Sequence, residues 1–286
     1  MERAEVNGVE LDYEVIGSGE PVLLISPVVA DGFLPLVSAL ESRGRYRFVR
    51  YHRRGWCGST HTAPPVTIRD HAADAIGLLE YLQLSRAHVI GHSHGGAIAL
   101  QLAFERPDLV HTLALLEPAL YSLPSAALLF ERAAPSVEAY CAGDMEGAVA
   151  GFLRVASGLE LERCLAVLDE HVPGGFARAV EDADTLFGVE LPAVVAWTFG
   201  PEQAATISQP VLSVLGAETD QLWVDAAATL RCWFPKLDER RVDGVGHLLH
   251  MQNPAPIARE LGAFLSHHPI GVGVKFHRSV ASAAER

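Results

Sequence analysis

Short apolar segments alternate with segments of helical periodicity over most of this chain. Apolar runs of strand length lie at 21–26, 46–51, 87–91 and 112–117, and helix-type segments lie near 33–43, 68–83 and 95–105. Strands separated by helices pair in parallel, because each helix carries the chain back to the edge where the next strand begins. The alternation therefore predicts an α/β fold with a mostly parallel sheet flanked by helices.

Both ends of the chain extend this pattern. Asn7-Gly8 lies between two short alternating segments, which is typical of a β-hairpin. Near the C-terminus, strands at 210–216 and 238–242 alternate with helices near 222–233 and 254–266. The hairpin and the other runs together predict eight strands.

Residues 118–208 interrupt the alternation of strands and helices. They keep helical spacing, which is broken at Pro124, Pro135, Pro173-Gly174-Gly175 and Pro192. We interpret this segment as a helical cap inserted into a core that comprises residues 1–117 and 209–268. The tail, 269–286, has no strong periodicity.

Charge and hydropathy exclude several classes of partner. The chain has 22 Lys and Arg against 35 Asp and Glu, a formal net charge of −13, so its surface repels nucleic acid and anionic lipid. Its apolar runs are too short to span a bilayer, and its N-terminus lacks the pattern of a signal peptide. Four scattered cysteines favour free thiols in a reducing compartment. We expect a cytoplasmic protein whose partner is a small-molecule substrate. Whether the chain also forms a homodimer through the surface of the cap is left open.

A glycine-rich turn joins the strand at 87–91 to the helix at 95–105. Its sequence Gly91-His92-Ser93-His94-Gly95 fits G-x-S-x-G, a turn that raises its serine above the sheet. The serine takes a positive φ, and side chains at the flanking positions would collide with the neighbouring strand and helix. The helix dipole and the His94 amide favour an oxyanion beside the turn. The turn therefore predicts Ser93 as a nucleophile.

The two histidines beside Ser93 also allow an interpretation as a metal site. The sequence after His94 lacks the Asp-His pair of a hydrolase-type zinc motif, and no cysteine or carboxylate lies nearby in the sequence. We therefore expect no metal and no cofactor. His92 is expected to pack under the turn at the pocket, and His94 to line the pocket floor.

A nucleophilic serine needs a base, and the base needs an acid that orients it. His247 lies in a glycine-rich loop after the last strand, at the sheet edge where Ser93 also lies, whereas His250 follows at helical spacing and is expected to pack or face solvent. Asp220 follows the strand at 210–216 and gives the order Ser, Asp, His. We prefer Asp220, with Glu117, at the end of the preceding strand, and Glu218 as alternatives.

Together these residues resemble the α/β-hydrolase superfamily, in particular its cap-bearing bacterial esterases, lactonases and carbon–carbon bond hydrolases. RRGWCGS at 53–59 is similar to the family's R-G-x-G-x-S loop, and FERPDLV at 104–110 ends the helix after the turn. The resemblance covers about residues 3–268. It implies an α/β-hydrolase fold with an inserted helical cap.

The resemblance also implies where the oxyanion would be bound, and the chain departs from the family there. Where the family has His-Gly, this chain has Ser26-Pro27-Val28, and Pro27 has no amide hydrogen and a fixed φ. The resemblance implies that the Val28 amide acts together with the His94 amide. Ser26 either places its hydroxyl in the pocket or caps the strand.

These features predict a metal-free serine hydrolase that cleaves an ester, thioester or lactone of a largely apolar small molecule. The cap carries apolar aromatic residues that are expected to pack its core and border a pocket, namely Phe130, Phe152, Phe176, Phe187, Trp197 and Phe199. Two other hypotheses stay open. In the first, the same residues catalyse a different reaction, as in a carbon–carbon bond hydrolase, a lyase or a cofactor-free oxidative enzyme. In the second, the fold binds a ligand without catalysis.

Overall fold

A single sheet of eight strands organises the computed structural model, which describes residues 1–41 and 45–271. The strands are β1 (Glu2–Val6), β2 (Val9–Gly17), β3 (Glu20–Ile25), β4 (Tyr46–Tyr51), β5 (Ala87–His92), β6 (Val110–Leu116), β7 (Val211–Gly216) and β8 (Asp238–Val242). They lie in the order β1-β2-β4-β3-β5-β6-β7-β8. β2 runs antiparallel to both of its neighbours, and the other neighbouring strands are parallel. The predicted mostly parallel eight-stranded sheet is confirmed.

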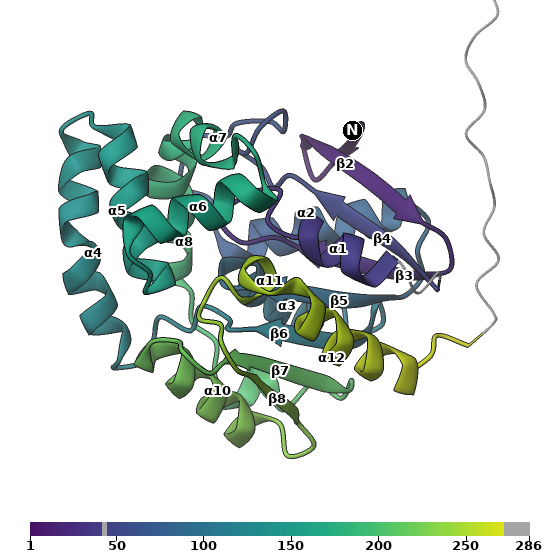
Figure 1. Ribbon diagram of the computed structural model, residues 1–286. Coiled ribbons are helices and arrows are strands. Elements are labelled where there is room, and N and C mark those ends of the chain that lie inside the picture. Colours follow the sequence, from purple (N-terminus) through teal and green to yellow (C-terminus); the bar gives the residue numbers. More distant parts are fainter. Residues whose placement is uncertain (42–44, 272–286) are drawn as a thin grey trace, which may run out of the picture.

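Helices cover both faces of this sheet (Figure 1). One face carries α1 (Leu34–Glu41) and α12 (Pro254–His267), preceded by the short α11 (Leu249–Gln252), and the other carries α2 (Ile68–Tyr81), α3 (His94–Glu105) and α10 (Gln221–Trp233). In β3, Val22 and Leu24 pack in the first layer, and Leu23 and Ile25 pack in the second. Successive side chains point to opposite faces, so a strand covered on both sides is apolar throughout.

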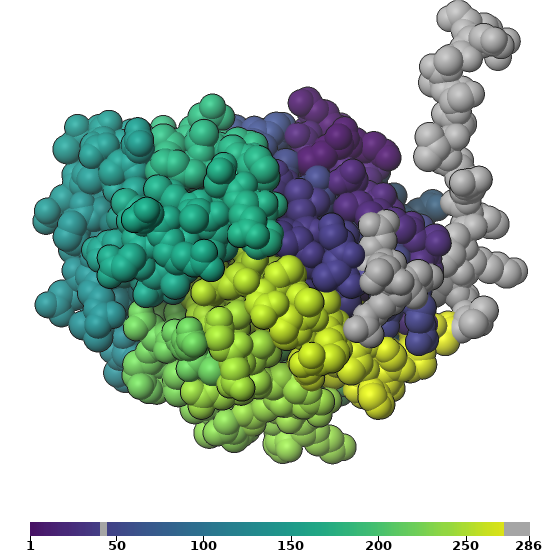
Figure 2. Space-filling view, viewed as in Figure 1, coloured from purple at the N-terminus to yellow at the C-terminus, as the bar shows by residue number. Residues whose placement is uncertain are grey.

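Between β6 and β7 the chain forms only helices, and we refer to these helices as the cap. They are α4 (Ala126–Cys141), α5 (Met145–Ser157), α6 (Leu161–His171), α7 (Gly175–Glu181), the π-helix η1 (Thr185–Glu190), α8 (Leu191–Ala196) and α9 (Pro201–Ala204). Figure 1 shows α4 to α8 gathered at one end of the sheet, and Figure 2 shows the teal and green surface of the cap lying directly against the core. The cap has its own apolar cluster, which also includes Val29 and Trp56 from core loops and Met251 from α11.

One sequence expectation for the helices differs from the structure, and another falls mostly outside the described residues. Pro135 was expected to break the helical pattern, but α4 continues through it, and α4 packs along α5. A proline inside a helix removes one backbone hydrogen bond, and tertiary packing can outweigh that loss. Of the predicted tail at 269–286, residues from 272 onward lie outside the described part of the chain. Within the described ranges, no helix has both the length and the apolar composition needed to cross a membrane.

The start of α2 is held by a capping box between Thr67 and Asp70. The Thr67 hydroxyl accepts a hydrogen bond from the Asp70 amide over 3.2 Å, and the Asp70 carboxylate accepts one from the Thr67 amide over 2.8 Å. Each bond satisfies an amide that the helix itself leaves without an acceptor. Thr67 and Asp70 stand at the three-residue spacing that this motif requires.

We expect Thr67→Ala to lower the free energy of unfolding by about 1 kcal/mol, the usual loss when an N-cap hydroxyl is removed. Urea denaturation followed by circular dichroism measures this change. Thr198→Ala is the matched control, because Thr198 is exposed and outside any helix or strand. Equal stability of the two variants would contradict the role of the cap residue.

Candidate active site

Ser93 lies at the sharp turn between β5 and α3. Its backbone has φ 53° and ψ −120°, which is the positive φ that the turn sequence predicts. A Cβ at Gly91 would collide with the carbonyl oxygen of Gly95, and one at Gly95 would collide with the carbonyl oxygens of Ile25 and Ser26. The glycines therefore let the first turn of α3 approach the ends of β3 and β5.

His247 contacts Ser93 from the loop that follows β8. Its Nε2 lies 3.0 Å from the Ser93 Oγ, and its ring stacks on Trp223 with 3.7 Å between centroids and 9° between planes. The backbone carbonyl of His247 accepts a hydrogen bond from His92 Nε2 over 2.8 Å. Burial lowers the pKa of His247, so the imidazole is neutral and able to accept a proton.

Glu117 completes a hydrogen-bonded chain from Ser93. It follows β6, and its Oε2 lies 2.7 Å from His247 Nδ1. The Gly216 amide donates to its Oε1 over 2.8 Å, and the Thr219 hydroxyl donates to its Oε2 over 3.0 Å. Burial raises the pKa of Glu117 to about 8, although the hydrogen bonds from Gly216 and Thr219 act to lower it. These two donors hold the carboxyl group in one orientation toward His247.

The expected partner of His247, Asp220, lies elsewhere, so the preference for Asp220 over Glu117 is corrected. Asp220 occupies the N-cap position of α10, where its carboxylate lies 3.6 Å from Arg132 Nη1 and 36% of the side chain is exposed. It acts on His247 only through its charge, which raises the pKa. β6 and β7 are parallel neighbours, so acids after either strand lie at the same edge. Within the described residues, no hydrogen bond joins Glu218 to His247.

Val28 and His94, the expected oxyanion donors, line one small cavity with Ser93. The Pro27 carbonyl accepts a hydrogen bond from Arg53 Nη1 over 3.0 Å. In a trans peptide the carbonyl and the amide hydrogen point in opposite directions, so the Val28 amide points away from Arg53. His94 is the first residue of α3, and its amide has no acceptor within the helix. The oxyanion role of the two amides stays a prediction of the resemblance.

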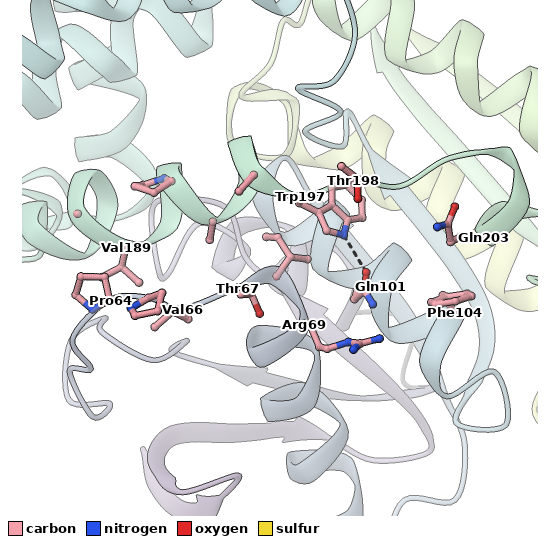
Figure 3. A pocket seen from close by; sticks show the side chains of 16 residues that line it. Pro64, Val66, Thr67, Arg69, Gln101, Phe104, Val189, Trp197, Thr198 and Gln203 are labelled. Carbon is pink, nitrogen blue, oxygen red and sulfur yellow. Dashed lines mark hydrogen bonds between the residues drawn. The ribbon is translucent and has the colours of Figure 1, made fainter.

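Two of the three expected pocket residues lie outside this cavity. The Ser26 hydroxyl is buried and accepts a hydrogen bond from Arg53 Nη1 over 3.2 Å. Trp197 borders a separate groove between the cap and α2–α3, where its Nε1 donates to Gln101 over 2.8 Å (Figure 3). His92 does line the cavity, as expected. The apolar wall opposite Ser93 is instead formed by cap residues such as Phe152, Leu153, Leu186 and Val194.

A buried polar cluster beside the cavity was missed from the sequence. Both carboxylate oxygens of Glu190, at the end of η1, accept hydrogen bonds from Arg53, over 2.7 and 2.9 Å. His94 Nε2 lies 3.8 Å from Glu190 Oε1, and the rings of His94 and His71 meet edge to face with 5.6 Å between centroids. Burial alone would raise the pKa of Glu190, but Arg53 lowers it to about 2, so the carboxylate is charged.

The cluster includes one set of groups within the described residues whose spacing suits a metal ion. Ligand atoms of His71, His94 and Glu190 lie within 4.8 Å of one another. Burial lowers the pKa of His71 to about 3 and that of His94 to about 4, so both imidazoles are neutral. However, the guanidinium of Arg53 occupies both oxygens of Glu190 and places a positive charge where a cation would bind. The donor set therefore does not fit a cation while Arg53 is in place.

The family model described as the alpha/beta hydrolase fold matches residues 26–254. The chain belongs to the alpha/beta hydrolase family. RutD from Caulobacter vibrioides is 36% identical over 116 residues, which are 38% of this chain and 42% of that protein. The chain thus matches about two fifths of the length of this curated relative.

Solved structures of alpha/beta hydrolases superpose on most of the chain. An enol-lactonase from Burkholderia xenovorans LB400 gives a TM-score of 0.70 at 22% identity and covers 93% of this chain and 100% of its own. An esterase from Thermogutta terrifontis gives 0.77 at 20% identity, with 94% and 100% covered. At these identities the likeness establishes the fold.

In this hydrolase the Arg53–Glu190 pair joins the cap to the core. We expect Arg53→Met to lower the free energy of unfolding by about 3–5 kcal/mol, because it leaves Glu190 buried and unpaired. The double variant Arg53→Met/Glu190→Leu is expected to recover most of this loss. Urea denaturation measures both changes.

Arg69→Met is the matched control, since its side chain is 72% exposed in its pair with Glu105 and such pairs contribute under about 1 kcal/mol. If Arg53→Met cost no more than this control, the buried pair would not hold the cap.

Proposed function

We propose that this alpha/beta hydrolase is a serine hydrolase that cleaves an ester, thioester or lactone of a largely apolar small molecule. The observation that carries the proposal is the chain of hydrogen bonds that joins Ser93 to His247 and His247 to Glu117. Its Ser93 end lines a cavity. A hydroxyl, a neutral imidazole and a carboxylate in this order form the arrangement that activates serine for attack on a carbonyl.

In the proposed mechanism, Ser93 Oγ attacks the substrate carbonyl while His247 Nε2 takes the hydroxyl proton. Glu117 keeps the Nδ1 hydrogen of His247 in place and stabilises the imidazolium that forms. The amides of Val28 and His94 donate to the oxyanion. His247 then returns the proton to the leaving oxygen or sulfur, and water hydrolyses the acyl-enzyme by the same steps.

The surroundings of Ser93 support a largely apolar substrate. Beyond the polar groups of the reaction, the cavity is lined mainly by apolar side chains, including Phe152, Leu153, Leu186, Val194 and Met251. Burial of a charged substrate against such a wall would cost several kcal/mol without a partner. The esterase and the enol-lactonase that share this fold are consistent with the proposal.

We expect a fluorophosphonate probe to add covalently to the wild-type protein and not to Ser93→Ala, because the probe reacts with serines that are activated by a base. Intact mass spectrometry of both proteins measures the adduct. A burst of p-nitrophenol from p-nitrophenyl butyrate, equal to the enzyme concentration, would further support an acyl-enzyme.

Absence of an adduct on the wild type would count against acyl transfer at Ser93. A substrate that is cleaved at a carbon–carbon bond without an acyl-enzyme burst would assign the other reaction class.

We expect Glu117→Gln to lower kcat for p-nitrophenyl butyrate by about 10³- to 10⁴-fold, since an amide cannot hold the imidazole in the required tautomer. Asp220→Asn is the matched control and is expected to change kcat by less than about threefold, because Asp220 does not contact His247. Steady-state kinetics with thermal melting of each variant separates loss of activity from loss of structure. Similar, mild losses in the two variants would overturn the assignment of Glu117.

A further inference from the structure

The cavity at Ser93 is too small for both the acyl and the alcohol parts of an ester. Its volume is about 30 Å³, enough for only a few water molecules. An ester that reaches Ser93 must therefore extend into an adjoining space. Two larger hollows border the cap, one of about 590 Å³ between the cap and α2–α3 and one of about 500 Å³ between α4 and α8.

The larger hollow, drawn in Figure 3, is separated from Ser93 by the backbone of η1 and α8. Val189, Pro192 and Ala193 line the hollow, whereas Glu190 and Val194 line the cavity, and no residue lines both. This helical wall is fixed to the core at two points. The Thr185 hydroxyl donates to the Gly55 carbonyl over 2.6 Å, and Glu190 is paired with Arg53. Joining the two spaces would require displacement of an anchored helix.

The hollow between α4 and α8, which we call the cap groove, borders the cavity directly. Tyr121, Phe152 and Leu191 line both spaces. The cavity and the cap groove therefore share these three residues as a common wall, whereas the larger hollow shares none with the cavity. This makes the cap groove the adjoining space into which a molecule bound at Ser93 can extend.

The cap groove is also the most apolar exposed surface of the cap. Of the seven large hydrophobic side chains that are exposed among the described residues, Phe130, Val137 and Val195 line it. They are 37%, 45% and 53% exposed. Glu138 is the one charged residue among its lining residues, all of which are described. A contiguous apolar patch of this kind is typical of a binding site.

We propose that the cap groove binds the alkyl chain of the substrate while its ester group lies at Ser93, so that the substrate class is long-chain esters. This inference rests on the proposed hydrolase function. An alkyl chain is the occupant that suits both observations, because it is apolar along its length and narrow enough to pass between three side chains. Each methylene that leaves water raises affinity by about fourfold.

The test compares p-nitrophenyl butyrate with p-nitrophenyl dodecanoate below its micelle-forming concentration. In the wild type we expect kcat/KM to be higher for the dodecanoate. Val195→Asp places a charge in the cap groove, and Ala134→Trp fills it; both are expected to lower the ratio of dodecanoate to butyrate kcat/KM at least tenfold. Leu128→Asp is the matched control, because Leu128 is 47% exposed on α4 but does not line the cap groove. It is expected to leave the ratio unchanged.

The outcomes separate this inference from the proposed function. If butyrate is hydrolysed and the ratio is the same in all four proteins, the cap groove does not bind the chain. If the wild type hydrolyses neither ester, displacement of a fluorescent apolar dye by dodecan-1-ol decides the inference alone. Displacement from the wild type and Leu128→Asp but not from Val195→Asp supports it, and equal displacement from all three overturns it. The proposed function itself fails only if the fluorophosphonate probe also forms no adduct at Ser93.

Two other occupants of the cap groove would also overturn the proposal. A concentration-dependent dimer in sedimentation that Val195→Asp abolishes, with an unchanged substrate ratio, would assign the surface to a second copy of the chain. Binding to phosphatidylcholine vesicles that the same variant abolishes, again with an unchanged ratio, would assign it to a lipid surface.

Discussion

The close approach of α3 to the ends of β3 and β5 is the constraint on which the site depends. It exists because Gly91, Gly95 and Gly96 have no side chains: a Cβ at Gly96 would lie 2.7 Å from the Cβ of Pro118, and the other two would meet backbone carbonyls. The approach places Ser93 at positive φ and sets the first amide of α3 beside the loop that follows β3. The proposed nucleophile and the proposed oxyanion amide of His94 are therefore positioned by backbone packing.

A second constraint is the guanidinium of Arg53. It donates to the Ser26 hydroxyl, to the Pro27 carbonyl and to both oxygens of Glu190. The first two contacts orient the loop that carries Val28, which lacks the glycine usual in the family, and the last two attach the cap. A buried ion pair adds little net stability when its desolvation is included, but its directional bonds allow one arrangement of loop and cap. One side chain thus holds both the loop of the proposed oxyanion site and the cap that covers it.

The sequence predicted the parts of this alpha/beta hydrolase fold that follow from local pattern. Continuous apolar runs predicted the buried strands, the turn sequence predicted the positive φ of Ser93, and the glycine-rich loop after β8 pointed to His247 as its partner. The hydrogen-bond partner of His247 was misassigned because β6 and β7 end at the same edge, so chain order does not decide between Glu117 and Asp220. Only the structure shows that the Gly216 amide and the Thr219 hydroxyl hold Glu117 toward His247, whereas Asp220 occupies the N-cap position of α10. Arg53 and Glu190 are 137 residues apart, and no local pattern joins them.

The attachments of the cap also determine how its two sides differ. Toward α2 and the loop after β4, the cap is held by directional bonds from Thr185 and Glu190, which resist any displacement of η1. Toward α4, the largely apolar side chains of Tyr121, Phe152 and Leu191 line both the cavity and the cap groove. Local opening follows the weakest contacts. A cap fixed on one side and closed by rotatable apolar side chains on the other admits an apolar molecule without losing the arrangement at Ser93.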